Sequence, residues 1–198
     1  MFRVPSNCRF EVDDFEQPWS YIRPFDFIHG RELEGAIRNP DQVFNQAYDN
    51  LKPNGWFEMS TMEPTTYSDD GTDVRATSMV EAIKHMHESS KLFGKDLMSS
   101  LTWRQRMEKA GFVNVKEEIY KLPQSPWPKD PKLKDLGRYH QLNMLEAMPP
   151  YTYALLTRVL GWNRVEIEAL LAGVRQELRD LSIHLYTKVH VVYGQRPE

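Results

Sequence analysis

The chain has a single cysteine, Cys8, among its 198 residues. An internal disulfide is therefore excluded, and one thiol with scattered histidines provides no zinc-ligand set. Lysine plus arginine (25) and aspartate plus glutamate (28) nearly balance, giving a formal net charge of −3. No charge excess therefore points to nucleic acid or an anionic membrane, and no apolar run approaches the roughly 20 residues that span a bilayer. We expect an intracellular protein, cytoplasmic or nuclear, with no metal, nucleic-acid or membrane partner.

Glycine-rich turns are also missing, although the chain contains ten glycines. Gly-x-Gly never occurs, and neither a Walker loop nor a Gly-x-Ser-x-Gly elbow is present. These absences exclude a phosphate loop of the usual kind and a nucleophile elbow. The only close histidine pair, His85 and His87, lies in a segment with helical periodicity. Helical positions two apart diverge by about 200°, so this pair forms no metal-binding face.

The first third of the chain alternates short apolar runs with a helix-sized segment. Residues 10–13 and 25–29 are apolar, are bounded by turn residues and are predicted to be strands. Asn39-Pro40 is a typical helix start, and apolar residues follow it at helical spacing. A Pro-Asn-Gly turn at 53–55 then leads into a predicted strand at 56–62. Strand, helix and strand in this order favour a crossover within a parallel sheet.

The remainder is predicted to be mainly helical, with two further strands. The expected elements are a loop at 64–71, a long helix ending at Gly94, a short helix at 103–110 and strands at 112–122 and 184–194. Between these strands, Asn163 and Glu166 form a capping-box pattern at the start of the best-defined helix. The pattern as a whole predicts a single α/β domain.

Five motifs occur in a fixed order along the chain. They are Phe10-Glu-Val-Asp-Asp14, Pro24-Phe-Asp-Phe-Ile-His-Gly-Arg31, Leu51-Lys-Pro-Asn-Gly-Trp-Phe-Glu58, Leu156–Trp162 and Val192–Pro197. In this order they resemble class I S-adenosylmethionine (SAM) dependent methyltransferases, and among them the fungal LaeA-like group. The resemblance implies an incomplete Rossmann-like fold with helical lid insertions. The five predicted strands would be strands three to seven of a sheet ordered 3-2-1-4-5-7-6, with the seventh antiparallel.

Two features of such a fold are absent from the sequence. One is the Gly-rich turn after strand one, and the other is a carboxylate after strand two that holds the ribose hydroxyls. Both would precede residue 1, because a βα unit takes roughly 30 residues and strand three is expected at 10–13. We therefore expect an N-terminally truncated family member, for which SAM is the implied cofactor although two of its binding segments are missing.

The resemblance assigns cofactor-binding roles to Asp13, Asp14, Phe15, Gly30 and Arg31. The acidic pair would accept a hydrogen bond from the adenine amine, and Phe15 would lie against the adenine ring. Gly30 and Arg31 would face the methionine end of SAM, beyond the carboxyl end of their strand. The residues alone leave alternatives open, since an acidic pair also suits the cap of a turn and Arg31 suits an ion pair with a nearby glutamate.

His29 is the only candidate for a catalytic base. It ends an expected central strand next to a glycine, which favours a position in a pocket. A core histidine with one satisfied hydrogen bond is the alternative.

Residues 64–110 and 123–182 would be the lid-type insertions, and both are rich in Tyr, Trp and Met. They are expected to fold over a small-molecule substrate, or else to pack as a helical cap. The function implied is methyl transfer linked to fungal secondary metabolism. A non-methylating cyclase or isomerase and a non-catalytic regulatory interaction module remain open. Since strand four would be an open apolar edge, residues 25–28 (Phe25–Ile28) are expected to support a homodimer or a regulatory protein contact.

Overall fold

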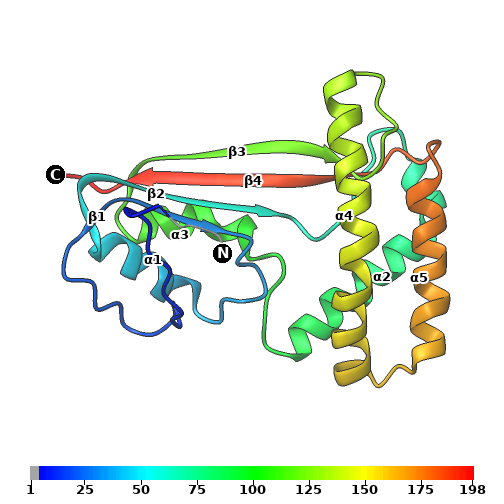
Figure 1. The fold of residues 1–198 in the computed structure, drawn as a ribbon, viewed down its shortest axis with the longest axis horizontal. Helices are drawn as coiled ribbons and strands as arrows, with labels where there is room; N and C mark the ends of the chain where they lie inside the picture. Colours follow the sequence, from blue (N-terminus) through cyan, green and yellow to red (C-terminus); the bar gives the residue numbers. More distant parts are fainter. Residues whose placement is uncertain (1–4) are drawn as a thin grey trace.

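The computed structural model describes residues 5–198 as a four-stranded sheet with helices below it and at one end (Figure 1). The strands are β1 (Phe25–Arg31), β2 (Leu51–Met62), β3 (Val113–Pro123) and β4 (Tyr186–Gln195). The helices are α1 (Pro40–Asp49), α2 (Thr77–Leu92), α3 (Trp103–Lys109), α4 (Pro131–Leu155) and α5 (Arg164–Arg179). Short 3-10 turns, η1 (Thr72–Arg75) and η2 (Ser99–Thr102), precede α2 and α3, and a π-helical turn, η3 (Leu156–Leu160), extends α4.

The strand order is β1-β2-β4-β3. β1 pairs in parallel with β2, whereas β4 is antiparallel to both β2 and β3. The predicted order of the fourth, fifth, seventh and sixth strands is therefore confirmed, with the seventh antiparallel. Because β1, β2 and β3 run in one direction, their carboxyl ends meet at the same end of the sheet, where ligands of open α/β sheets bind.

The prediction of a strand at residues 10–13 is wrong. These residues form no strand, and the side chains of Phe10 and Val12 are exposed. A strand is stable only when a neighbour satisfies its backbone and one face is buried. In this run the acidic Glu11 and Asp13 alternate with the apolar residues, and among the described residues β1 pairs only with β2.

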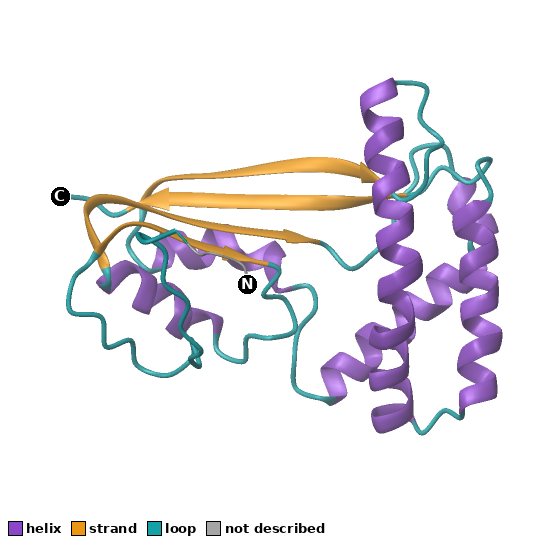
Figure 2. Ribbon diagram, in the orientation of Figure 1, coloured by secondary structure: helices purple, strands orange, loops and turns teal. Residues whose placement is uncertain are grey.

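Two apolar cores hold the structure together. The first lies between the sheet and helices α1 and α3, with Phe44, Phe57, Met59 and Trp103 almost fully buried. The second lies within the group of α2, α4 and α5, which Figure 2 shows beyond the carboxyl ends of the parallel strands. Of the two expected insertions, 64–110 therefore contributes α2 to the helical group and α3 to the layer below the sheet. That the group acts as a lid stays a prediction.

The helix starts follow from local sequence. Asn39 caps α1 by accepting a hydrogen bond from Gln42 N, and Pro40 occupies the first turn, where its missing N–H costs nothing. The predicted capping box is present at α5, where Asn163 and Glu166 satisfy each other's backbone N–H groups.

The position of α4 depends on Gly137. A Cβ on this residue would collide with the backbone carbonyl of Ser125. The missing side chain lets α4 lie directly against the loop that follows β3, and this contact brings one face of α4 to the end of the sheet.

Candidate functional site

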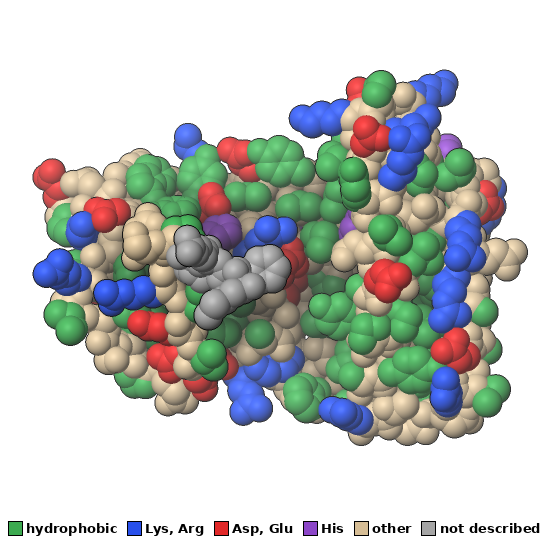
Figure 3. All heavy atoms as spheres, viewed as in Figure 1, with side chains coloured by type: hydrophobic (Ala, Val, Ile, Leu, Met, Phe, Trp, Pro, Cys, Tyr) green, Lys and Arg blue, Asp and Glu red, His purple; other side chains and the backbone are tan. Residues whose placement is uncertain are grey.

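A cavity of about 650 Å³ lies between the carboxyl end of the sheet and helices α2 and α4. Its walls are mainly apolar, and Figure 3 shows apolar side chains gathered along α4. The apolar lining residues are Met62, Ile83, Met86, Leu97, Leu122, Leu136, Met144, Ala147, Met148 and Leu155. A volume of this size, with polar side chains set among mainly apolar surface, is typical of a small-molecule site.

Glu34 supplies one of those polar groups. It follows β1 by three residues, and its Oε1 accepts a hydrogen bond from Ser100 N of η2 at 2.6 Å. Its other oxygen, Oε2, is buried and has no hydrogen-bond partner among the described residues. Burial raises the pKa of Glu34 to about 7, although the hydrogen bonds from Ser100 oppose the shift. Glu34 therefore presents an unpaired carboxyl oxygen whose charge changes near neutral pH.

His140 supplies a second polar group, from α4. Its side chain is 6% exposed, and Nε2 has no partner among the described residues. Burial alone lowers the pKa of His140 to about 4, because the charged imidazolium loses its hydration. At neutral pH the ring is therefore neutral, and its Nε2 is a buried nitrogen without a partner among the described residues.

Glu32 fixes the loop that carries Glu34. Its backbone N–H donates to Ser60 O at 2.9 Å, and its carboxylate accepts from Met62 N at 3.2 Å and from the Thr61 hydroxyl at 3.3 Å. These bonds join the segment after β1 to the end of β2. Glu32 adopts a left-handed backbone (φ 53°), a strained conformation for a non-glycine residue, and this pairing compensates for it.

A buried polar chain lies beside the pocket. Glu63 follows β2, lines the cavity and is 1% exposed. The Tyr67 hydroxyl donates to one carboxylate oxygen at 2.6 Å, and His190 Nε2 lies 3.3 Å from the other. His190 Nδ1 in turn lies 2.9 Å from Glu117 Oε1. Burial, together with the bond to Glu63, raises the pKa of Tyr67. Both oxygens of Glu63 are thus occupied, in contrast to Glu34.

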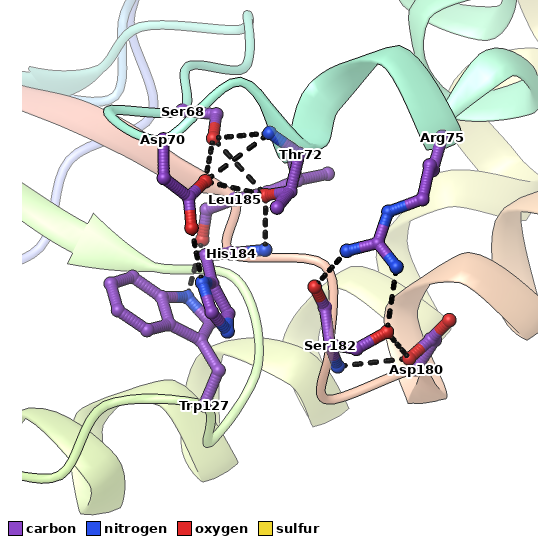
Figure 4. A network of polar contacts seen from close by, with 9 residues as sticks. All are labelled: Ser68, Asp70, Thr72, Arg75, Trp127, Asp180, Ser182, His184 and Leu185. Atoms are coloured by element: carbon purple, nitrogen blue, oxygen red, sulfur yellow. Dashed lines mark hydrogen bonds and ion pairs between the residues drawn. The ribbon is translucent and has the colours of Figure 1, made fainter.

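A second polar network holds the helical group to the sheet (Figure 4). Asp70 accepts from the hydroxyls of Ser68 (2.7 Å) and Thr72 (2.8 Å) and lies 2.6 Å from His184 Nδ1, whose ring stacks on Trp127. Although serine, histidine and aspartate meet here, Ser68 bonds to the aspartate and not to the histidine. The arrangement therefore lacks a nucleophile–base pair, and it ties the region of η1 to the start of β4.

The predicted residues of β1 take different positions. Arg31 lines the pocket. His29 does not, because it lies on the opposite face of the sheet from α1 and α3, where Nδ1 is 3.0 Å from Glu58 Oε1 and its side chain is 38% exposed. At Gly30 a Cβ would collide with the Sδ of Met59, so close packing of β1 on the core accounts for this glycine. The role of His29 as a base stays a prediction.

The residues predicted to contact adenine make local contacts in the structure. The Asp13 carboxylate accepts from Asp14 N at 2.8 Å, and that of Asp14 accepts from Glu16 N at 3.0 Å, so the pair caps a turn. Phe15 packs against the core below the sheet, and its carbonyl accepts from the Trp19 indole at 2.8 Å. Among the described residues, the guanidinium of Arg31 suits the carboxylate at the methionine end of SAM, and the adenine contacts of Asp13, Asp14 and Phe15 stay a prediction.

Glu34 and His140 are the pocket residues that sequence reasoning missed. Glu34 is one of the nearby glutamates that the sequence offers as an ion-pair partner of Arg31, and no other role was predicted for it. For His140 a signal was available, because Leu136, His140, Met144 and Met148 recur at helical spacing and place the histidine in an apolar stripe.

Comparison with known proteins identifies the family. A family model described as a methyltransferase domain matches residues 3–117. The chain therefore belongs to the methyltransferase domain family, and the predicted family assignment is confirmed. Within residues 5–198, no helix is both long and apolar enough to cross a bilayer.

The curated relatives come from fungi. The chain is 35% identical to the probable methyltransferase tdiE of Emericella nidulans, over 94% of this chain and 59% of the relative. It is 33% identical to the methyltransferase pytC of Aspergillus terreus, over 98% of this chain and 60% of the relative. The secondary metabolism regulator LAE1 of Cochliobolus heterostrophus is 30% identical, over 99% and 65%. These names agree with the LaeA-like resemblance, and the chain spans about 60% of the length of its relatives.

Proposed function

We propose that this chain supplies the methyl-acceptor side of a SAM-dependent methyltransferase site that acts on a small molecule of fungal secondary metabolism. The observation that carries the proposal is the position of the pocket. It opens at the carboxyl ends of β1 and β2 in a member of the methyltransferase domain family, with Arg31 on its wall. The relatives named for methyl transfer and secondary metabolism support it.

SAM would supply the methyl group as an electrophilic carbon on its sulfonium. The chain's own residues bind and orient the acceptor. Met86, Met144 and Met148 enclose its apolar part, and the loop held by Glu32 places Glu34 beside it. Catalysis of this kind depends mainly on positioning, because an in-line approach of two bound reactants removes much of the entropic barrier.

The test is a titration of the isotope-labelled 198-residue chain with S-adenosylhomocysteine, followed by amide NMR. We expect saturable shifts confined to the segments after β1 and β2, residues 31–34 and 61–65. We expect weak binding, with a dissociation constant on the order of 1 mM, since among the described pocket residues Arg31 is the one arginine or lysine that can pair with the carboxylate of the ligand. If neither segment shows shifts up to the solubility limit of S-adenosylhomocysteine, the proposal is overturned. Arg31→Gln should weaken the binding, and Arg104→Gln, on the exposed side of α3, is the matched control.

A further inference from the structure

Two residues that line the pocket each have a buried polar atom that nothing in the described protein satisfies. Glu34 Oε2 and His140 Nε2 both lack a hydrogen-bond partner there, and both residues line the same cavity. Leaving such an atom unpaired costs about 1–3 kcal/mol. Glu34 comes from the segment after β1 and His140 from α4, so the two are brought to one cavity by separate elements.

The charges around the pocket favour a cation. Glu32, Glu34 and Glu63 line it together with a single arginine, Arg31. His190 lies against Glu63 and also lowers the proton affinity of Glu34, whereas Asp96 raises it. His140 is neutral at neutral pH and so does not repel a cation. Of the lining carboxylates, Glu34 is the one that retains a buried unpaired oxygen.

We propose that this pocket binds a mainly apolar molecule that carries a protonated amine, with the ammonium group on the carboxylate of Glu34. The ammonium–carboxylate bond is charge-assisted and lies in a poorly hydrated site, which makes it stronger than a neutral hydrogen bond. The methionine and aliphatic walls bury the rest of the molecule. The claim that this molecule is the methyl acceptor rests on the proposed function; the claim that the pocket selects an apolar amine does not.

The experiment uses three probes with one apolar body and different heads: 4-phenylbutylamine, 4-phenyl-1-butanol and 4-phenylbutyrate. Their affinities for the 198-residue chain are measured by titration calorimetry at pH 8 and pH 5. At pH 8 we expect the amine to bind at least about tenfold more tightly than the alcohol, and the carboxylate to bind least tightly. At pH 5 the preference for the amine should largely disappear, because Glu34 is then protonated.

Glu34→Gln keeps the acceptor for Ser100 N and removes the charge, so the amine and the alcohol should bind this variant equally at both pH values. Glu108→Gln is the control, since Glu108 pairs with Arg104 on the exposed side of α3, away from the pocket. It should keep the wild-type preference. Equal binding of amine and alcohol to the wild type at pH 8, or tighter binding of the carboxylate, overturns the proposal.

A second measurement does not depend on a variant. Amine binding to the wild type at pH 6.5 should release protons, because the bound cation favours ionised Glu34, and alcohol binding should not. Calorimetry in two buffers of different ionisation enthalpy measures this release, and its absence contradicts the assignment to Glu34. The outcome is separate from that of the S-adenosylhomocysteine titration. Amine selectivity without cofactor shifts would retain the amine site and reject methyl transfer, and the reverse result would reject the amine site alone.

Discussion

Replacing Glu34 by glutamine should change how the stability of the protein depends on pH. The pKa of Glu34 rises from an ordinary 4.5 to about 7 in the folded protein, mainly because burial removes water from the carboxylate. Between these two pH values the folded state holds a proton that the unfolded state has released. The contribution of Glu34 to stability is therefore greatest below pH 4.5 and decreases as the pH rises to 7.

The shift sets the size of the effect. One pKa unit corresponds to about 1.4 kcal/mol, so ionising Glu34 in its buried position costs about 3 kcal/mol above pH 7. The glutamine of the Glu34→Gln variant carries no charge and avoids this cost, while its amide oxygen can still accept from Ser100 N. Relative to the wild type, the variant should gain about 3 kcal/mol between pH 4.5 and pH 8.

Denaturant unfolding of the two proteins at pH 4.5, 6 and 8 measures this difference. Comparing the two proteins at each pH cancels the groups that they share, His140 included. The control is Glu108→Gln, whose exposed ion pair contributes about 0–1 kcal/mol and should give a nearly constant difference. If the difference for Glu34→Gln is equally constant with pH, Glu34 is hydrated in solution, and the argument from its burial fails.

Three further perturbations test other parts of the structure. Burial holds the pKa of His140 at about 4 against an ordinary 6.5, so the wild type should lose about 3 kcal/mol relative to His140→Gln as the pH falls from 6.5 to 4. Denaturant titrations of the two proteins measure this difference, and pH profiles that run parallel would contradict it. Gly137→Ala should lower the free energy of unfolding by about 1–3 kcal/mol, because the added Cβ meets the carbonyl of Ser125, and an unchanged melting temperature would show that the loop after β3 yields. We also propose that a second copy pairs along β1 through residues 25–28; sedimentation equilibrium should then show a wild-type dimer that Phe27→Lys dissociates, and a wild type that is monomeric at every concentration would reject the pairing.

Most of the sheet could be predicted because its strands are either apolar runs or alternating patterns with clear ends. β1, β3 and β4 lie within two residues of their expected bounds. β2 begins five residues earlier than expected, at Leu51, and includes the Pro-Asn-Gly turn. The reason is tertiary, since Asn54 N donates to Arg196 O, and Arg196 N donates to Gly55 O, both at 2.9 Å. A turn signal in the sequence cannot show that the distant end of the chain will pair with it.

The prediction of a strand at residues 10–13 was wrong for a related reason. Its pattern was locally acceptable, but a short strand exists only through its neighbours, and these four residues have none in the described structure. Assigning adenine contacts to Asp13 and Asp14 depended on that strand. The two carboxylates form the turn cap that was the alternative interpretation of the acidic pair, and their contact with adenine stays a prediction.

The polar residues of the pocket could be predicted from the sequence even less well than the strands. Helical spacing could have placed His140 in an apolar stripe, but whether its ring nitrogen has a partner depends on how closely α4 approaches the sheet, which Gly137 sets through its contact with Ser125. Glu32 and Glu34 stand two residues apart after Arg31 and look equivalent in the sequence. The structure separates them. The carboxylate of Glu32 accepts hydrogen bonds from the end of β2, whereas Glu34 lines the cavity and has one buried carboxyl oxygen without a partner among the described residues. An unsatisfied buried atom is a property of the whole fold, and for that reason the residue most suited to select a ligand here is one that no motif singles out.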